Sequence, residues 1–160
     1  MKDKIDIPLA KRVSVFEVEE GTKLSPKFDE NGLIPVLTTD NKSGEVLMHG
    51  YMNEEALLLT IQKKEAYYWS RSRKSIWHKG KTSGLTHQVR GIRIDDDQDA
   101  IWLMVDVMGV GASCHVGYRS CFYRSVHIDS NNNVELKFEE DEKVFDPEVV
   151  YDGQENPTKL

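Results

Sequence analysis

A disulfide framework, a membrane span and a secretion signal are all missing from this sequence. Two cysteines among 160 residues cannot form a disulfide scaffold. No apolar stretch approaches the ~18 residues of a membrane-spanning helix. The first residues mix lysine and aspartate where a signal peptide would have an apolar core. Five prolines and eleven glycines exclude a collagen-like or low-complexity chain. We therefore expect a soluble, cytoplasmic protein with one main domain.

Charge is distributed unevenly along the chain. The formal net charge is -6, but residues 129–160 contain ten acidic residues and three lysines, which leaves +1 for residues 1–128. Residues 63–94 hold nine basic residues against Glu65 alone, and an aspartate cluster follows directly. A basic strip beside carboxylates suits a phosphorylated ligand near a metal ion, although an ordinary solvated face has the same pattern. A body charge of +1 is weak for a nucleic-acid-binding protein, so we expect no nucleic-acid partner.

Hydrophobic periodicity indicates an α+β domain that is strand-rich, compact and has one main helix. Short apolar or alternating runs predict strands at 13–18, 33–39, 45–49, 66–69, 87–94, 100–107, 121–128 and 134–138. The 100–107 run is nearly continuous, which predicts a central strand buried on both faces. Asn53 followed by two glutamates predicts the start of a helix that ends near Lys64. We expect residues 70–86 to form a polar loop.

The aspartate cluster lies between two predicted strands. In extended backbone, alternate side chains share a side, so Asp95, Asp97 and Asp99 are expected to converge while Asp96 points the other way. Converging carboxylates repel each other unless a cation or basic groups neutralise them. Hard oxygen ligands favour Mg²⁺ or Ca²⁺. The alternative is a solvated acidic turn.

A glycine-containing loop carries both cysteines. Cys114 and Cys121 lie on either side of Gly117, and His115 follows the first cysteine. Thiolates are strong zinc ligands, and a loop of this kind can turn both toward one ion. The spacing is not that of a zinc finger, and two buried, inert thiols are the alternative.

A third stretch, residues 69–84, combines basic, hydroxyl and aromatic side chains. Arginine forks and glycines permit close approach to phosphate, and Trp69 or Trp77 could stack on a base. The glycine spacing is not that of a Walker motif. The candidate substrate-binding residues are Trp69, Arg71, Arg73, Lys79 and Ser83.

Together these stretches resemble phosphoribosyl-AMP cyclohydrolases, the ring-opening hydrolases of histidine biosynthesis. The resemblance spans roughly residues 28–126 and implies a cyclohydrolase-like catalytic domain at 29–128. Residue pattern and charge add an N-terminal extension (1–28) and an acidic tail (129–160), which we expect to be loosely docked or disordered. The motifs, in family order, are Gly32-Leu-Ile-Pro, Glu45-Val-Leu-Met, Tyr51-Met-Asn-Glu-Glu-Ala-Leu, Tyr68-Trp-Ser-Arg-Ser-Arg, Trp77-x-Lys-Gly-x-x-Ser-Gly84, the aspartate cluster and Ala112-x-Cys-His-x-Gly-x-x-Ser-Cys-Phe-Tyr-Arg124.

The resemblance implies an intertwined homodimer with zinc at the subunit interface and magnesium nearby. The family's zinc thiolates fall on Cys114 and Cys121, and its magnesium ligands fall on Asp95, Asp97 and Asp99. Where the family has its third zinc cysteine this chain has Asp96, which we expect to serve as the zinc ligand instead. The alternative is that Asp96 faces away and that His115 or water completes the coordination.

The implied reaction is hydrolytic opening of the adenine ring of phosphoribosyl-AMP at the N1–C6 bond. Substitution at N1 makes C6 electrophilic, and zinc lowers the pKa of a water that it binds toward 7. His115 or His87 could move the proton. The family often has histidine where this chain has Leu85. Two alternatives stay open: a related hydrolase acting on a different purine nucleotide, and a non-catalytic nucleotide-binding module.

Overall fold

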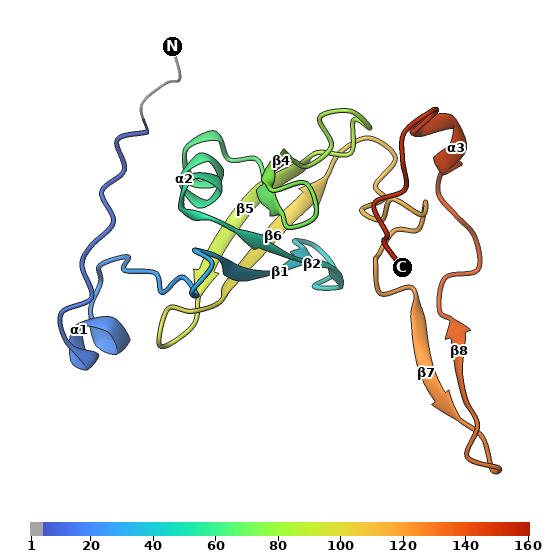
Figure 1. The fold of residues 1–160 in the computed structure, drawn as a ribbon, viewed down its shortest axis with the longest axis horizontal. Coiled ribbons are helices and arrows are strands. Elements are labelled where there is room, and N and C mark those ends of the chain that lie inside the picture. Colours follow the sequence, from blue (N-terminus) through green and yellow to red (C-terminus); the bar gives the residue numbers. More distant parts are fainter. Residues whose placement is uncertain (1–4) are drawn as a thin grey trace.

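A four-stranded sheet in the order β2-β1-β6-β5 forms the centre of the fold. Figure 1 shows this computed structural model, which describes residues 5–160. β1 pairs antiparallel with β2 and parallel with β6, and β6 pairs antiparallel with β5. The strands are β1 (Ile34–Asp40), β2 (Val46–Met52), β5 (His87–Ile94) and β6 (Ile101–Val107). The α+β class predicted from the sequence is confirmed.

Local chemistry accounts for the two hairpins of this sheet. At the β1–β2 turn, the Asp40 carboxylate accepts the backbone N–H groups of Lys42 and Ser43, at 2.9 and 2.7 Å, which holds the predicted five-residue loop closed. In β5 the register shifts between Val89 and Gly91. This shift confirms the irregularity predicted at Gly91. A side chain would not fit there, because a Cβ would lie 2.6 Å from the Met104 side chain.

Burial along β6 corrects one sequence prediction. The strand is central in the sheet, but only Ile101, Leu103 and Val105 are buried. Trp102 on the opposite face is 36% exposed, and its neighbour on β1, Leu37, is 41% exposed. Within one chain the sheet is therefore covered on one face only, and the continuous apolar run reflects an open apolar face.

The main helix, α2 (Glu54–Lys63), and a small hairpin pack against the covered face. Asn53 caps the helix by accepting the N–H of Ala56 at 2.9 Å, as predicted. Leu57 joins the core of the sheet. Strands β3 (Tyr67–Ser70) and β4 (Ser75–His78) form the hairpin. The loop predicted over 70–86 is wrong for β4, because a strand of four residues is too short to show an apolar alternation.

The N-terminal extension contains a helix where the sequence predicted a strand. The prediction over 13–18 is wrong, because Ser14 accepts the N–H of Glu17 at 3.1 Å and caps α1 (Val15–Glu20). The extension is fastened to the aspartate turn, where Arg12 donates to the carbonyls of Ser25 and Asp97 at 2.6 and 2.8 Å. Its first four residues lie outside the described part of the chain.

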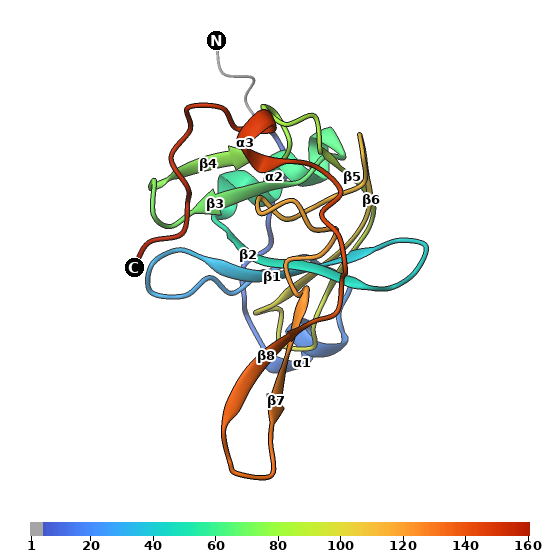
Figure 2. The ribbon, with the colours of Figure 1, turned by 90° about the vertical axis from the view of Figure 1, so that its right-hand side faces the viewer.

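The C-terminal part forms a projecting hairpin and then returns to the body. β7 (Arg124–Ile128) pairs with β8 (Val134–Phe138), and Figures 1 and 2 show this hairpin extending away from the sheet. The residue 128/129 boundary expected from the sequence falls at its tip. The tail beyond it docks on the cysteine loop: the N–H of Val144 donates to the Gly117 carbonyl at 2.7 Å, ahead of α3 (Pro147–Val150). None of the helices in residues 5–160 is long and apolar enough to cross a membrane.

Candidate functional site

Residues 113–121 form a tight loop that brings the two cysteines together. The N–H of Ser113 donates to the Arg119 carbonyl at 2.9 Å, and that of Cys114 donates to Tyr118 at 3.1 Å. Gly117 makes the reversal possible, with a φ of +106° that side chains rarely adopt. The thiols of Cys114 and Cys121 lie close enough to interact with each other, and neither is in a disulfide.

The interaction between the thiols makes one of them acidic. It lowers the pKa of Cys114 to about 7, helped by the Val116 backbone and by the positive charge of Lys79. The pKa of Cys121 is raised because this thiol keeps the shared proton. A thiolate is therefore available near neutral pH, and the thiolate is the form that binds metals.

A buried chain of hydrogen bonds connects the core of the sheet to Ser113, the first residue of the cysteine loop. Thr38 Oγ1 lies 2.7 Å from Tyr68 Oη, which lies 3.3 Å from His87 Nδ1. His87 Nε2 lies 3.0 Å from Ser113 Oγ. The ring of His87 is fully buried, and burial together with the charge of Lys79 lowers its pKa to about 3. Both ring nitrogens are thus occupied by protein groups, and His87 is neutral at pH 7.

Two further titratable side chains, Lys79 and His115, lie beside and within the cysteine loop. Lys79 is 3% exposed, donates from Nζ to the Ser113 carbonyl at 2.6 Å, and lies 5.1 Å from the centroid of the Trp77 ring. Burial lowers its pKa, while the negative charges of the cysteines act in the opposite direction. His115 is half-buried, and its Nε2 has no hydrogen-bond partner within residues 5–160. Burial and Lys79 lower the pKa of His115.

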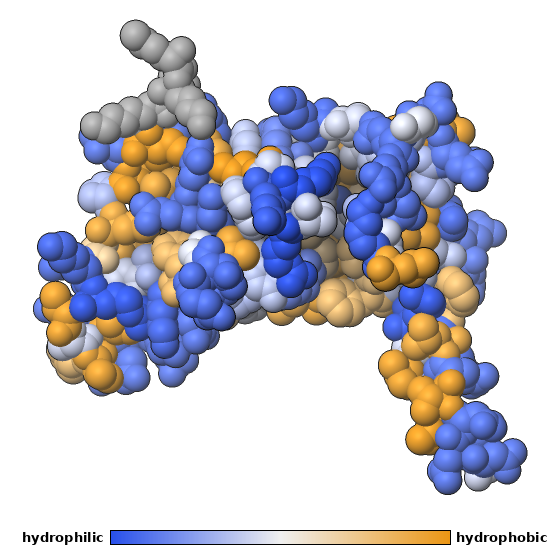
Figure 3. Space-filling model, in the orientation of Figure 1, coloured by the Kyte–Doolittle hydropathy of each residue, from blue (hydrophilic) through white to orange (hydrophobic). Residues whose placement is uncertain are grey.

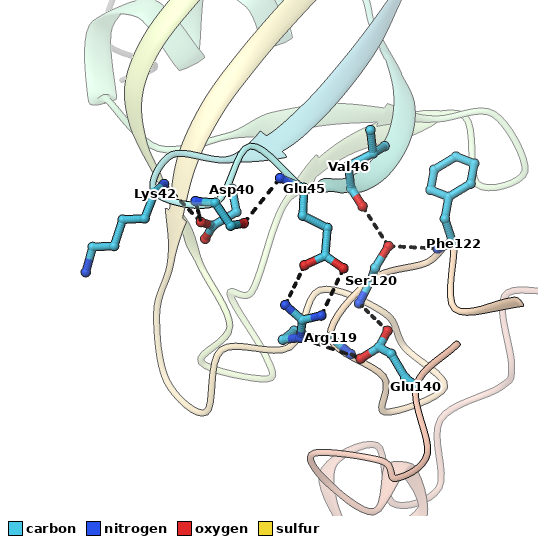
Figure 4. Close-up of polar contacts among 9 residues, drawn as sticks. Asp40, Lys42, Glu45, Val46, Arg119, Ser120, Phe122 and Glu140 are labelled. Atoms are coloured by element: carbon cyan, nitrogen blue, oxygen red, sulfur yellow. Dashed lines mark hydrogen bonds and ion pairs between the residues drawn. The ribbon is translucent and has the colours of Figure 1, made fainter. Parts of the chain in front are cut away.

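Charged side chains fix the second half of the loop, as Figure 4 shows. The guanidinium of Arg119 forms a two-pronged ion pair with Glu45, with Nη2 at 2.9 Å from Oε1. The carboxylate of Glu140 accepts the backbone N–H groups of Arg119 and Ser120 at 2.9 and 3.0 Å. The N–H of Cys121 donates to the Leu47 carbonyl at 2.7 Å. The loop is thereby tied to both β2 and the acidic tail.

The three outer aspartates converge at the other end of β5. Oxygen atoms of Asp95, Asp97 and Asp99 lie within 4.8 Å of one another. Their convergence was predicted, but the backbone is a turn and not an extended strand: Gln98 has a φ of +58°, and its N–H donates to the Asp95 carbonyl at 3.2 Å. Hydrogen bonding to Asp95 raises the pKa of Asp99. Asp96 is exposed and stands outside this group.

The thiol pair and the aspartates are far apart within one chain. His87, beside the thiol loop, begins β5, and Asp95 follows its last residue. Eight residues of strand span about 26 Å at ~3.3 Å per residue. Figure 1 likewise shows the turn after β5 and the loop after β6 at opposite ends of the sheet. The structure does not bring Asp96 to Cys114 and Cys121 in a single chain.

The candidate substrate-binding residues lie on and after the β3–β4 hairpin. The guanidinium of Arg71 stacks 4.2 Å from the centroid of the Tyr51 ring, and that of Arg73 lies 5.8 Å from Trp77. Trp69 is half-buried and pairs with Ile76 across the hairpin. Ser83 is half-buried and its Oγ accepts the Leu85 N–H at 3.3 Å. The arginines are exposed, whereas Lys79 is enclosed beside the thiols.

Sequence reasoning missed several supporting residues. Tyr68 begins one of the family motifs, but its hydrogen bond with Thr38 joins positions 30 residues apart and leaves no local signal. Ser113 stands next to a cysteine and had no signal of its own. Glu140 lies in a run of four acidic residues, and the sequence does not indicate which of them contacts the loop.

Comparison with known proteins extends the local resemblance to most of the chain. Residues 48–123 match the family model described as phosphoribosyl-AMP cyclohydrolase. A phosphoribosyl-AMP cyclohydrolase of Rhodopseudomonas palustris (strain HaA2) is 51% identical over 135 residues, which are 84% of this chain and 90% of that protein. One from strain BisB18 is 48% identical over 144 residues, 90% and 97% of the two chains. One from Sinorhizobium fredii is 49% identical over 135 residues, 84% and 88%.

Proposed function

The chain belongs to the phosphoribosyl-AMP cyclohydrolase family. We propose that it opens the adenine ring of phosphoribosyl-AMP as a homodimer that uses both zinc and magnesium ions. It is a hydrolase of histidine biosynthesis. The rest of the proposal rests on the interacting pair of thiols, with a buried lysine and an unpartnered histidine nitrogen near them. Reduced thiols of this kind suit the cytoplasm, which is the proposed location.

The donor set at the cysteine loop fits Zn²⁺. Thiolate sulfur and imidazole nitrogen are its preferred ligands, and Cys114 and Cys121 already face each other. We assign both cysteines as zinc ligands and Asp96 as the third. His115 Nε2 is the alternative third ligand, since it has no other partner in the described chain. When bound, zinc supplies Lewis acidity, which makes water acidic enough to react at neutral pH.

The outer aspartates fit Mg²⁺. Asp95, Asp97 and Asp99 present only oxygen ligands. Hydrogen bonding to Asp95, together with the nearby negative charges, raises the pKa of Asp99, and a divalent cation would reverse this shift. The substrate carries two phosphate groups, and Mg²⁺ is commonly shared between protein carboxylates and substrate phosphates.

A second copy of the chain is needed to complete this site, because β5, which spans about 26 Å, separates Asp96 from the thiols within one chain. Two uncovered surfaces support such a homodimer. The sheet face that bears Leu37 and Trp102 is exposed. The β7–β8 hairpin has an apolar face, seen as orange in Figure 3. Its exposed apolar residues are Val126, Ile128, Val134, Leu136 and Phe138.

The chain's own residues bind the substrate and move its protons. Arg71 and Arg73 are exposed and bind phosphate, Trp69 stacks on the base, and Ser83 donates a hydrogen bond. Water oxygen adds to C6, the N1–C6 bond breaks, and C6 becomes a carboxamide carbon. His115 takes one proton from water and gives it to N1, and the second water proton passes from the added oxygen to the exocyclic imino nitrogen, which becomes the NH2 of the carboxamide. The charge of Lys79 stabilises the thiolates.

Mixed dimers test the shared site. Asp96→Ala and Cys121→Ser homodimers are each expected to be inactive, because every site lacks one ligand. Unfolding and refolding the two variants together should restore about a quarter of wild-type activity, since half of the dimers are hybrids with one intact site each. Full activity of Asp96→Ala alone would exclude Asp96 as a ligand.

The substrate is tested in a histidine auxotroph that lacks the cyclohydrolase. We expect the wild-type chain to restore growth without histidine and Cys114→Ser to fail at equal expression. Failure of the folded, metal-loaded wild-type chain would point to a different purine nucleotide.

A further inference from the structure

We infer that Glu140, in the acidic C-terminal tail, is a positioning residue that holds Cys121 in place to bind metal; this role rests on the proposed zinc site. Glu140 lies beyond the residues matched by the family model. Its two carboxylate oxygens each accept one backbone N–H, from Arg119 at 2.9 Å and from Ser120 at 3.0 Å, as Figure 4 shows. Its side chain is only 13% exposed.

These two N–H groups belong to the residues immediately before Cys121. In the same turn, the N–H of Cys121 donates to the Leu47 carbonyl at 2.7 Å, and that of Phe122 donates to Ser120 Oγ at 2.9 Å. Four consecutive amides are therefore fixed, two of them by Glu140. Removing the carboxylate would leave two amides without their protein acceptor, and the turn would have to rearrange to satisfy them.

Arg119 connects this contact to the sheet. Its Nε lies 3.7 Å from Glu140 Oε1, and its Nη atoms are paired with Glu45, just before β2. The Ser120 hydroxyl donates to the Val46 carbonyl at 2.7 Å. The turn before Cys121 is thus bound on one side by the tail, through Glu140, and on the other by the start of β2. This arrangement assigns a structural task to at least one of the ten acidic residues of 129–160.

The experiment compares Glu140→Ala and Glu140→Gln with Glu142→Ala. Glu142 is an exposed acid of the same tail, so its loss removes the same charge at a similar position. Two readouts that do not need turnover are taken on the full chain: zinc affinity by competition with a chelator, and capture of the metal-free thiols by a trivalent arsenical that must bind two neighbouring sulfurs. Cobalt substitution adds a thiolate-to-metal absorption band whose intensity reports how many sulfurs bind.

We expect Glu140→Ala to weaken zinc binding by roughly 10–100-fold, the range for residues that orient metal ligands. Its two thiols should react more slowly with the arsenical, and the intensity of its thiolate-to-cobalt absorption band should fall toward that of Cys121→Ser. Glu140→Gln should lie between, because its single carboxamide oxygen can replace only part of the carboxylate. Glu142→Ala should match wild type.

Three outcomes separate this inference from the proposed function. Wild-type zinc affinity and arsenical capture in both Glu140 variants would overturn the positioning role and leave the proposed function intact. If wild type binds no zinc, the zinc site fails, while slower arsenical capture in Glu140→Ala still supports the role in orienting the thiols. Should Glu140→Ala unfold, the same comparison is decided by Glu140→Gln, for which wild-type behaviour contradicts the inference.

Discussion

Replacing His87 with glutamine should change how the stability of the protein depends on pH. His87 is fully buried between Tyr68 and Ser113, and its pKa is lowered to about 3. An unfolded chain exposes the same imidazole, whose ordinary pKa is about 6.5. Glutamine can hydrogen-bond to both neighbours but does not titrate.

The direction and size of this pH effect on stability follow from the difference in proton binding between the folded and unfolded chains. Between pH 6.5 and about 3, the unfolded chain binds a proton at His87 that the folded chain excludes. The contribution of His87 to stability is therefore unaffected above pH 6.5 and falls as pH decreases, by about 1.4 kcal/mol per pH unit. At pH 5.5 the loss relative to pH 8 is about 1.4 kcal/mol, and at pH 4.5 about 2.7 kcal/mol.

Urea unfolding measured from pH 8 to pH 4.5 at one protein concentration checks this prediction. Wild type should lose stability more steeply than His87→Gln, so the difference between them shifts by the amounts above. His127→Gln on the exposed β7–β8 hairpin is the control and should follow wild type. Parallel pH dependences for wild type and His87→Gln would refute a buried, neutral His87.

Three further changes test the local structure. Tyr68→Phe removes the hydroxyl between Thr38 and His87, which should cost about 1–3 kcal/mol in urea unfolding; an unchanged midpoint would contradict that buried link. Asn53→Ala should cost about 1 kcal/mol by removing the cap of α2, measured in the same way and compared with wild type. Gly80→Ala should be far more damaging, because Gly80 has a φ of +82° and an added Cβ would lie 2.2 Å from the Leu85 backbone; soluble, fully stable Gly80→Ala would show that the turn is wrongly described.

Local signals in the sequence were sufficient for the central elements. The Asn53 cap, the turn after Asp40 and the shift at Gly91 each rest on a few neighbouring residues, and the structure has all three. The 13–18 stretch was misjudged because its alternating apolar residues resemble a strand, whereas the Ser14 cap favours a helix. Strand β4 was missed because its pairing with β3, and not its composition, makes it a strand.

The site was predictable where ligands are close in sequence and unpredictable where partners are distant. Cys114 and Cys121 share a loop, and Asp95, Asp97 and Asp99 share a turn, so spacing alone indicated that each set could meet. The separation of the two sets appears only once β5 is placed between them. The contacts of Glu140 depend on a hairpin that returns the chain to residues 20 positions earlier.

The most direct test of the proposed function is ring opening itself. The purified chain, supplied with Zn²⁺ and Mg²⁺, is incubated with phosphoribosyl-AMP while the ultraviolet absorption change of ring opening is followed. We predict turnover by wild type and by Glu142→Ala, and none by Cys114→Ser, which lacks one thiolate of the proposed zinc site. A folded, metal-loaded wild-type protein that leaves phosphoribosyl-AMP intact, or a Cys114→Ser variant that opens the ring at the wild-type rate, would contradict the account.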